Sequence, residues 1–177
     1  PIPKYQPNAV VYNELFTRDG GGEIDGIVLG IAADTCANLM YRLEHDQFQS
    51  LQAKVVWLLI GTNDLGAQKC SSDAVTAGIV AIVQKLQQLR PDATIVLNSI
   101  LPRHNKLMTQ IRDINERLEC LARSTPDRLQ YFDATNIFLN EDNGQLQHLP
   151  DQLHPDDLGS RLWGEEIVKR AKMILAG

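Results

Sequence analysis

The sequence has little cysteine, and it has no long hydrophobic run. Its three cysteines, Cys36, Cys70 and Cys120, are too few and too far apart for a disulfide framework or a cysteine-based metal site. No apolar stretch approaches the roughly 18 residues that a membrane-spanning helix needs, and the amino-terminal residues do not have the pattern of a signal peptide. These absences favour an ordinary globular chain without disulfide bonds or a membrane span.

Positive charge is also scarce. Lysine and arginine number 17 against 22 aspartates and glutamates, which gives a formal net charge of −5. No basic tract interleaved with aromatic residues is present, so nucleic acid is not an expected partner. The sequence lacks Gly-x-Gly-x-x-Gly and Walker loops, which makes a nucleotide-binding domain a poor interpretation. The basic side chains between positions 103 and 128 have helical spacing typical of an exposed helix face: Arg103, Lys106, Arg112, Arg117, Arg123 and Arg128.

Hydrophobic residues make up 44% of the 177-residue chain, which is enough for one domain with a sizeable core. Short apolar runs alternate with amphipathic helical patterns, which is typical of parallel βαβ units. We therefore predict the α/β class: a three-layer α/β/α sandwich around a flavodoxin-like parallel sheet, as one domain over residues 1–177 with an extended arm at residues 1–9. The expected strands are residues 26–31, 55–60, 94–100 and 129–132.

The expected helices are marked by apolar residues at intervals of three and four. The first follows a cap at Asp34 or Thr35, and the second is capped by Asp73. A third helix contains residues 107–121, and the last one opens at Pro155, because proline suits the first turn of a helix.

The longest unbroken apolar run, residues 55–60, is interpreted as a central strand covered on both faces. Gly-Thr-Asn-Asp at residues 61–64 ends this strand, and open α/β sheets bind ligands at the carboxyl ends of their strands. The amide of Asn63 on such a rigid strand end is suited to donating a hydrogen bond to a developing oxyanion. An ordinary strand-to-helix turn uses the same residue types, so the tetrapeptide by itself leaves both interpretations open.

A second informative stretch is Asp-Gln-Leu-His-Pro at residues 151–155. Proline pushes the preceding residue out of helical geometry, so His154 is expected at the start of a helix with Asp151 within reach of its ring. A carboxylate on one imidazole nitrogen leaves the other free to take a proton from a nucleophile. Capping of the helix by the two residues is the plainer alternative. The other histidines have no comparable partner in the sequence and are expected at the surface: His45, His104 and His148.

Three motifs together resemble the SGNH (GDSL-type) hydrolase family. Gly-Thr-Asn-Asp at 61–64 resembles the third conserved block of that family, and Asp-x-x-His-Pro at 151–155 resembles the fifth. Gly-Ile-Ala-Ala-Asp-Thr at 30–35 resembles the second block, Gly-x-x-Gly-Asp-Thr. The resemblance runs from about Val10 to the carboxyl terminus, and the most similar subgroup is the esterases that resemble the catalytic subunits of platelet-activating-factor acetylhydrolase. It implies the SGNH hydrolase fold and the hydrolysis of an acyl or acetyl ester.

The resemblance also implies a role for each matching residue. Asn63 would donate its side-chain amide to the oxyanion, and Ala33, in the block that begins at Gly30, would donate its backbone N–H. His154 would be the general base and Asp151 its orienting partner. The family normally has glycine where this chain has Ala33, and a backbone donor survives that change comfortably only if φ is negative. No metal and no organic cofactor is implied.

The nucleophile of the resembled family is missing. It is the serine of a Gly-Asp-Ser block at the end of the first strand, but this sequence contains no Gly-Asp-Ser and no serine before Ser50. The first strand, missing or degenerate, would lie between the strands expected at 26–31 and 55–60. Without it, both strands would have unpaired backbone groups, each costing about 1 to 3 kcal/mol if buried. Ser99, near the end of strand 94–100, is expected in the core or in a turn.

Three explanations of this gap are open. The sequence is part of a longer hydrolase whose serine lies upstream, or residues 9–12 form a shortened central strand in an inactive relative. Alternatively, another chain supplies the strand by strand addition.

The predicted function is an ester hydrolase that acts through a serine acyl-enzyme on a small ester or acylated substrate. The alternative is a non-catalytic binding or interaction module on the same scaffold, which the absent serine and Ala33 favour. A homodimer or a strand-donating chain is the expected kind of protein partner. The hydrolase hypothesis depends on the expectation that Asn63 and His154 share one crevice.

Overall fold

The computed structural model describes residues 7–45, 48, 50–103, 105–125, 128–140 and 142–177. The chain groups into two compact units: unit 1 contains residues 1–29, 102–104 and 134–177, and unit 2 contains residues 30–101 and 105–133. The prediction of a single domain stays a prediction. Of the predicted extended arm, residues 1–6 lie outside the described residues, and residues 7–9 are helical.

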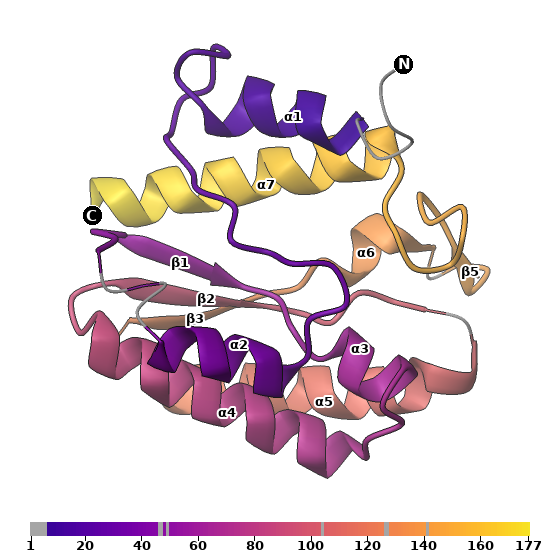
Figure 1. Ribbon diagram of the computed structural model, residues 1–177. Helices are drawn as coiled ribbons and strands as arrows, with labels where there is room; N and C mark the ends of the chain where they lie inside the picture. The colour runs from indigo at the N-terminus through magenta and orange to yellow at the C-terminus, as the bar shows by residue number, and fades with distance from the viewer. Residues whose placement is uncertain (1–6, 46–47, 49, 104, 126–127, 141) are drawn as a thin grey trace. The chain divides into compact units, whose positions relative to one another are not determined.

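Unit 2 contains a three-stranded parallel sheet in the order β1-β2-β3 (Figure 1). Its strands are β1 (Val55–Leu58), β2 (Thr94–Asn98) and β3 (Leu129–Phe132). Val55 pairs with Thr94, and Ile95 pairs with Leu129. Three of the four predicted strands are therefore confirmed, although β1 and β2 each end two residues earlier than expected.

Four helices complete unit 2, and α2, α4 and α5 lie along one face of its sheet (Figure 1). They are α2 (Cys36–Glu44), α3 (Thr62–Gly66), α4 (Ser72–Leu89) and α5 (Asn105–Ser124). Isoleucines of α4, β2 and α5 form the core, and each is at most 1% exposed: Ile79, Ile82, Ile95 and Ile114. Each such side chain contributes about 1.5–3 kcal/mol through burial, so the core fixes the strand ends that carry the candidate site.

Unit 1 is built on two long helices, α1 (Pro7–Phe16) and α7 (Asp157–Ala176). They pack closely, because a Cβ added at Gly164 would lie only 2.8 Å from Cδ1 of Leu15. The short helix α6 (Thr135–Phe138) packs on α7 through an edge-to-face contact between Phe138 and Trp163, whose ring centroids are 6.0 Å apart. Unit 1 also contains the antiparallel pair β4 (Leu139–Asn140) and β5 (Gln145–Leu146).

Two strand predictions in the amino-terminal part are wrong. Residues 26–31 form neither a strand nor a helix, and Ile27 and Val28 are 68% and 65% exposed. Residues 9–12, considered as a shortened central strand, lie within α1. An apolar run becomes a strand only where a neighbouring strand completes its backbone hydrogen bonds. Among the described residues, no strand pairs with residues 26–31.

The helix caps differ in part from those expected. Thr35 caps α2 as predicted and forms a capping box with Asn38. The cap of α4 is Ser71 rather than Asp73, and the cap of α7 is Asp156, so that helix does not open at Pro155. In each case the cap is a residue with an extended backbone and a side-chain oxygen. Where the sequence offers several such residues, tertiary packing determines which one caps the helix.

In the described part of the chain, no helix combines the length and the apolar content that crossing a membrane requires.

Candidate active site

The turn that presents Asn63 requires a glycine. Gly61 has φ +110° and precedes the first residue of α3. A Cβ at this position would lie 2.8 Å from Cγ1 of Val75 and 3.0 Å from Cδ1 of Ile100. Both the positive φ and the close packing exclude a side chain, so the tight turn sets Asn63 rigidly in the first turn of α3.

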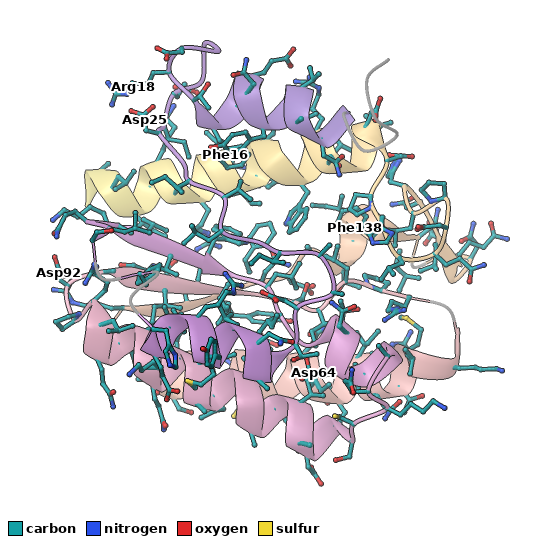
Figure 2. The ribbon with its side chains drawn as sticks, in the orientation of Figure 1. Phe16, Arg18, Asp25, Asp64, Asp92 and Phe138 are labelled. Atoms are coloured by element: carbon teal, nitrogen blue, oxygen red, sulfur yellow. The ribbon has the colours of Figure 1, made fainter. Side chains whose placement is uncertain are left out.

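Hydrogen bonds in both directions tie α3 to the segment that contains Ala33. The side-chain amide of Asn63 donates to the backbone carbonyl of Asp34 at 2.9 Å. In return, the backbone N–H of Cys36 donates to both carboxylate oxygens of Asp64 at 3.1 Å. Asp64 is 8% exposed and is labelled at α3 in Figure 2. An amide nitrogen carries two N–H groups, so the contact with Asp34 uses one donor of Asn63.

An ion pair also holds the same segment. The guanidinium of Arg42, on α2, donates to the carboxylate of Asp34, and both side chains are largely buried. The two predicted oxyanion donors, Asn63 and Ala33, thus lie on neighbouring elements that hydrogen bonds join within unit 2. Gly30, at the start of the block, is exposed, and a Cβ there would meet nothing within 4 Å, so packing does not demand a glycine at position 30.

Ala33 has a left-handed backbone conformation, with φ +66°. This is the conformation that glycine adopts without strain, and it costs an alanine about 1–2 kcal/mol. The φ of Ala33 is therefore positive at a position where the resembled family has glycine, which is the less favourable case for an alanine as backbone donor.

Replacing Ala33 with glycine is expected to raise the free energy of unfolding by about 0.5–1 kcal/mol, because relief of the strain outweighs the added entropy of the unfolded chain. Ala32 does not have a positive φ, so Ala32→Gly is expected to lower stability by about 0.5–1 kcal/mol. Urea denaturation of the two variants beside the parent measures the difference. A loss of stability in Ala33→Gly similar to that in Ala32→Gly would show that φ at position 33 is not strained.

In unit 1, Asp151 and His154 form the contact that their spacing predicts. Nδ1 of His154 lies 2.7 Å from a carboxylate oxygen of Asp151, and the other carboxylate oxygen accepts from the backbone N–H groups of His154 and Leu153 at 2.7 and 3.0 Å. Gln152, with φ +63°, makes the tight turn between them. With Nδ1 held by the carboxylate, Nε2 is the ring nitrogen that can accept a proton.

These hydrogen bonds lower the pKa of Asp151 from 3.8 to about 2, with the backbone N–H of His154 as the main cause and its ring as the second. A midpoint near pH 2 is the expected result when the carboxyl carbon is followed by NMR. Because the pKa is lower in the folded protein, the interaction stabilises the fold fully above about pH 4, and this contribution is lost as the pH falls toward 2. In His154→Ala the backbone donor remains, so the midpoint should stay below 3.8; a normal midpoint in the parent would contradict the geometry.

Arg103 is a residue near this pair that sequence reasoning misjudged. The helical spacing predicts an exposed helix face for it, but Arg103 precedes α5 and is partly buried. Burial lowers the pKa of its guanidinium, and the charge of Asp151 acts in the opposite direction. The one sequence signal that distinguishes Arg103 from the basic residues of the helix is its position directly after Leu101-Pro102.

The histidines expected at the surface differ from one another. His45 is exposed. His148 is less so, and its Nδ1 lies 3.7 Å from a carboxylate oxygen of Asp156, so it does have an acidic neighbour. His104 lies outside the described residues.

Within the described residues, the serines and cysteines offer no exposed nucleophile at a strand end. Ser99, directly after β2, is 0% exposed, as expected for a core position. Cys36 is buried beside Asp64, and burial together with that charge raises the pKa of its thiol to about 12, so the thiol stays protonated. The described part of the chain also contains no group of three or more histidine, cysteine or acidic side chains that could hold a metal ion.

The predicted site residues belong to both units. Unit 2 contains Asn63, Ala33 and Gly30, whereas Asp151 and His154 belong to unit 1. That Asn63 and His154 share one crevice therefore stays a prediction.

Comparison with known proteins gives matches over most of the chain. A model of the GDSL-like lipase/acylhydrolase family matches residues 4–162. Platelet-activating factor acetylhydrolase IB subunit alpha1 of Rattus norvegicus is 30% identical over 154 residues, which make up 84% of this chain and 62% of that protein. The chain thus spans less than two thirds of the length of this relative.

Solved structures give the same result for the fold. A putative platelet activating factor from Streptococcus pneumonia has a TM-score of 0.74 at 22% identity, covering 90% of this chain and 76% of that one. A putative acylhydrolase from Bacteroides fragilis has a TM-score of 0.73 at 18% identity, covering 94% and 82%. The chain shares the fold of these proteins, and the predicted α/β class is confirmed.

Proposed function

Because the chain belongs to the GDSL-like lipase/acylhydrolase family, we propose that it is an ester hydrolase that acts on an acyl or acetyl ester through a serine acyl-enzyme. The resemblance to the SGNH (GDSL-type) hydrolases is confirmed by the family match. The observation that carries the proposal is the 2.7 Å contact between Asp151 and Nδ1 of His154, directly before a proline and a helix. Such a pair is the base half of a catalytic triad.

In the proposed reaction, a serine hydroxyl attacks the acyl carbon of the ester while Nε2 of His154 takes the hydroxyl proton. The carbonyl π electrons move to the oxygen. They return when the bond to the alcohol breaks, and His154 gives its proton to the departing alcohol. Water then attacks the acyl-enzyme with the same base and releases the carboxylic acid and the serine. Asp151 remains ionised throughout, because its pKa of about 2 lies far below neutral pH.

Asn63 and the backbone N–H of Ala33 are the proposed donors to the oxyanion. Donors that are fixed before the reaction stabilise the developing charge without reorganisation. The Gly61 turn and the hydrogen bond from Asn63 to Asp34 support this role, because they hold the amide in one place. The proposal requires these donors and His154 to act on the same ester.

Hydrolysis of 4-nitrophenyl acetate tests the proposal. Asn63→Ala is expected to lower kcat/KM about 100-fold, because one oxyanion donor is lost. Gln68→Ala, an exposed residue just after α3, is the matched control and should leave the rate unchanged. Equal rates for the parent and Asn63→Ala would contradict the assigned role.

A non-catalytic binding module on the same scaffold is the second candidate. It is favoured by the lack of an exposed serine at a strand end in the described chain and by the positive φ of Ala33. It predicts that a fluorophosphonate probe labels no serine, while acetate still shifts the side-chain amide resonance of Asn63. Covalent labelling of a serine would eliminate this candidate.

A further inference from the structure

Asp34 connects the two proposed oxyanion donors. It directly follows Ala33, and its backbone N–H donates to the carbonyl of Ile31 at 3.2 Å, which closes the turn around Ala33. Its backbone carbonyl accepts the side-chain amide of Asn63 at 2.9 Å. A displacement of Asp34 would therefore move the backbone N–H of Ala33 and the amide of Asn63 together.

The carboxylate of Asp34 is tied to a second element, helix α2. The guanidinium of Arg42 donates to it, and the two side chains are only 16% and 13% exposed. An exposed ion pair is screened by water and restrains its partners little. In a buried pair each charge depends on the other, because leaving one of them unpaired is strongly unfavourable. The pair therefore fixes Asp34 relative to α2.

Helix α2 is a firm support for this ion pair. Cys36, in its first turn, is buried and lies so close to α4 that a Cβ added at Gly78 would be only 2.9 Å from the Cβ of Cys36. The backbone N–H of Cys36 also donates to the buried carboxylate of Asp64 at 3.1 Å. Arg42 thus connects Asp34 to a helix whose start is held by packing and by hydrogen bonds.

The backbone of Ala33 requires such a restraint. Its φ of +66° is a strained conformation for an alanine, and strained residues persist only where the surrounding structure holds them. The next residue, Asp34, is held through its side chain by Arg42 and through its carbonyl by Asn63. The ion pair therefore opposes the return of Ala33 to an unstrained φ.

We propose that Arg42 is a positioning residue for the proposed oxyanion hole. By holding Asp34, it keeps the backbone N–H of Ala33 and the amide of Asn63 in the arrangement in which both can donate to one oxyanion. This inference rests on the proposed function and adds to it a residue that acts through another without touching the ester. The alternative is an ion pair that only stabilises α2 and has no effect on the donors.

Two substitutions of similar length, Arg42→Met and Arg42→Lys, separate the charge from the packing. Methionine removes the cation, and kcat for 4-nitrophenyl acetate is expected to fall about 30-fold, because displaced donors lose most of their effect on the transition state. KM should change less than about twofold, because the oxyanion forms only after the substrate has bound. Lysine can still donate to the carboxylate of Asp34, so it should keep kcat within about fivefold of the parent.

The strain at Ala33 provides a test that a purely structural ion pair would not pass. Glycine adopts a positive φ without strain, so Ala33→Gly in the Arg42→Met background should restore kcat to within about fivefold of the parent. Ala32→Gly in the same background is the matched control. Ala32 does not have a positive φ, and this second glycine should restore nothing.

Nitrogen-15 relaxation at the backbone N–H of Ala33 gives a measurement that does not depend on hydrolysis. Its order parameter should be about 0.85 in the parent, as in rigid backbone, and should fall below about 0.6 in Arg42→Met. Arg123→Met is the control for the loss of one positive charge, because it removes an exposed ion pair with Glu119. It should change neither this order parameter nor kcat.

The outcomes separate this inference from the proposed function. A fall in kcat together with loss of order at Ala33 supports both. Loss of order in Arg42→Met, beside a parent that hydrolyses no ester, supports the positioning by Arg42 and counts against the hydrolase. An unchanged order parameter or an unchanged kcat in folded Arg42→Met overturns the inference, and so does a loss of kcat that Ala33→Gly fails to restore.

The unpaired carboxylate of Asp34 is the expected cause if Arg42→Met does not fold. The double variant Arg42→Met with Asp34→Asn then replaces it, because no buried charge is left without its partner. The same fall in kcat and the same loss of order at Ala33 are expected, and their absence overturns the inference in the same way.

Discussion

Replacing His154 with alanine is expected to lower the rate of ester hydrolysis about 1000-fold. The ring of His154 is held at 2.7 Å by Asp151 through Nδ1, which leaves Nε2 as the proposed proton acceptor. Removal of a positioned general base typically costs 10²–10⁴ in rate, and alanine has no group that can replace it. The measurement is kcat/KM for 4-nitrophenyl acetate.

Two controls separate catalysis from a general loss of structure. His45→Ala removes an exposed histidine whose ring stacks on Tyr41, and it should leave the rate unchanged. Asp151→Asn keeps the shape but lacks the charge that fixes the tautomer, so it should lose most of the activity. Unchanged hydrolysis by His154→Ala would remove His154 from the mechanism, and with it the esterase proposal.

Gly61→Ala is expected to lower the free energy of unfolding by about 3 kcal/mol. The positive φ alone costs an alanine about 1–2 kcal/mol, and the Cβ would meet Val75 at 2.8 Å and Ile100 at 3.0 Å. Both neighbours belong to the core, where overpacking adds about 1–3 kcal/mol. Denaturation in urea measures the loss, which is large for a domain whose total stability is about 5–15 kcal/mol.

Gly21 provides the matched control for this variant. Its φ of +95° is similar, but a Cβ there would meet nothing within 4 Å. Gly21→Ala should therefore cost only the backbone strain, about 1 kcal/mol. Equal losses in the two variants would mean that the packing around Gly61 contributes nothing.

The sequence predicted correctly those helices and strands that the spacing of apolar residues within one segment is enough to indicate. The run at 55–60 and the pattern of α4 were recognised because a buried strand and an amphipathic helix each leave a regular spacing of apolar residues. The run at 26–31 has an equally good strand pattern, but it forms no ladder. A strand depends on a neighbour that may come from anywhere in the fold, and the pattern of one segment does not contain that information.

At the candidate site, too, local contacts could be predicted and contacts between distant segments could not. Asp151 and His154 are three residues apart, so their contact follows from local geometry and proline chemistry. The hydrogen bonds from Asn63 to Asp34 and from Cys36 to Asp64 join segments about thirty residues apart and were not predicted. The sequence left the sign of φ at Ala33 open, and the structure shows that it is positive.

The sequence by itself determined the α/β class, the parallel strands β1 to β3 and the hydrogen-bonded pair of Asp151 and His154, because short-range spacing encodes each of them. Tertiary structure alone decided that residues 26–31 form no strand, that residues 9–12 are helical and that α3 is bonded to the Ala33 segment. The physical reason is that strands pair, and side chains become buried, between segments that are distant in the chain. The apolar pattern of one segment does not identify the segment that it will contact.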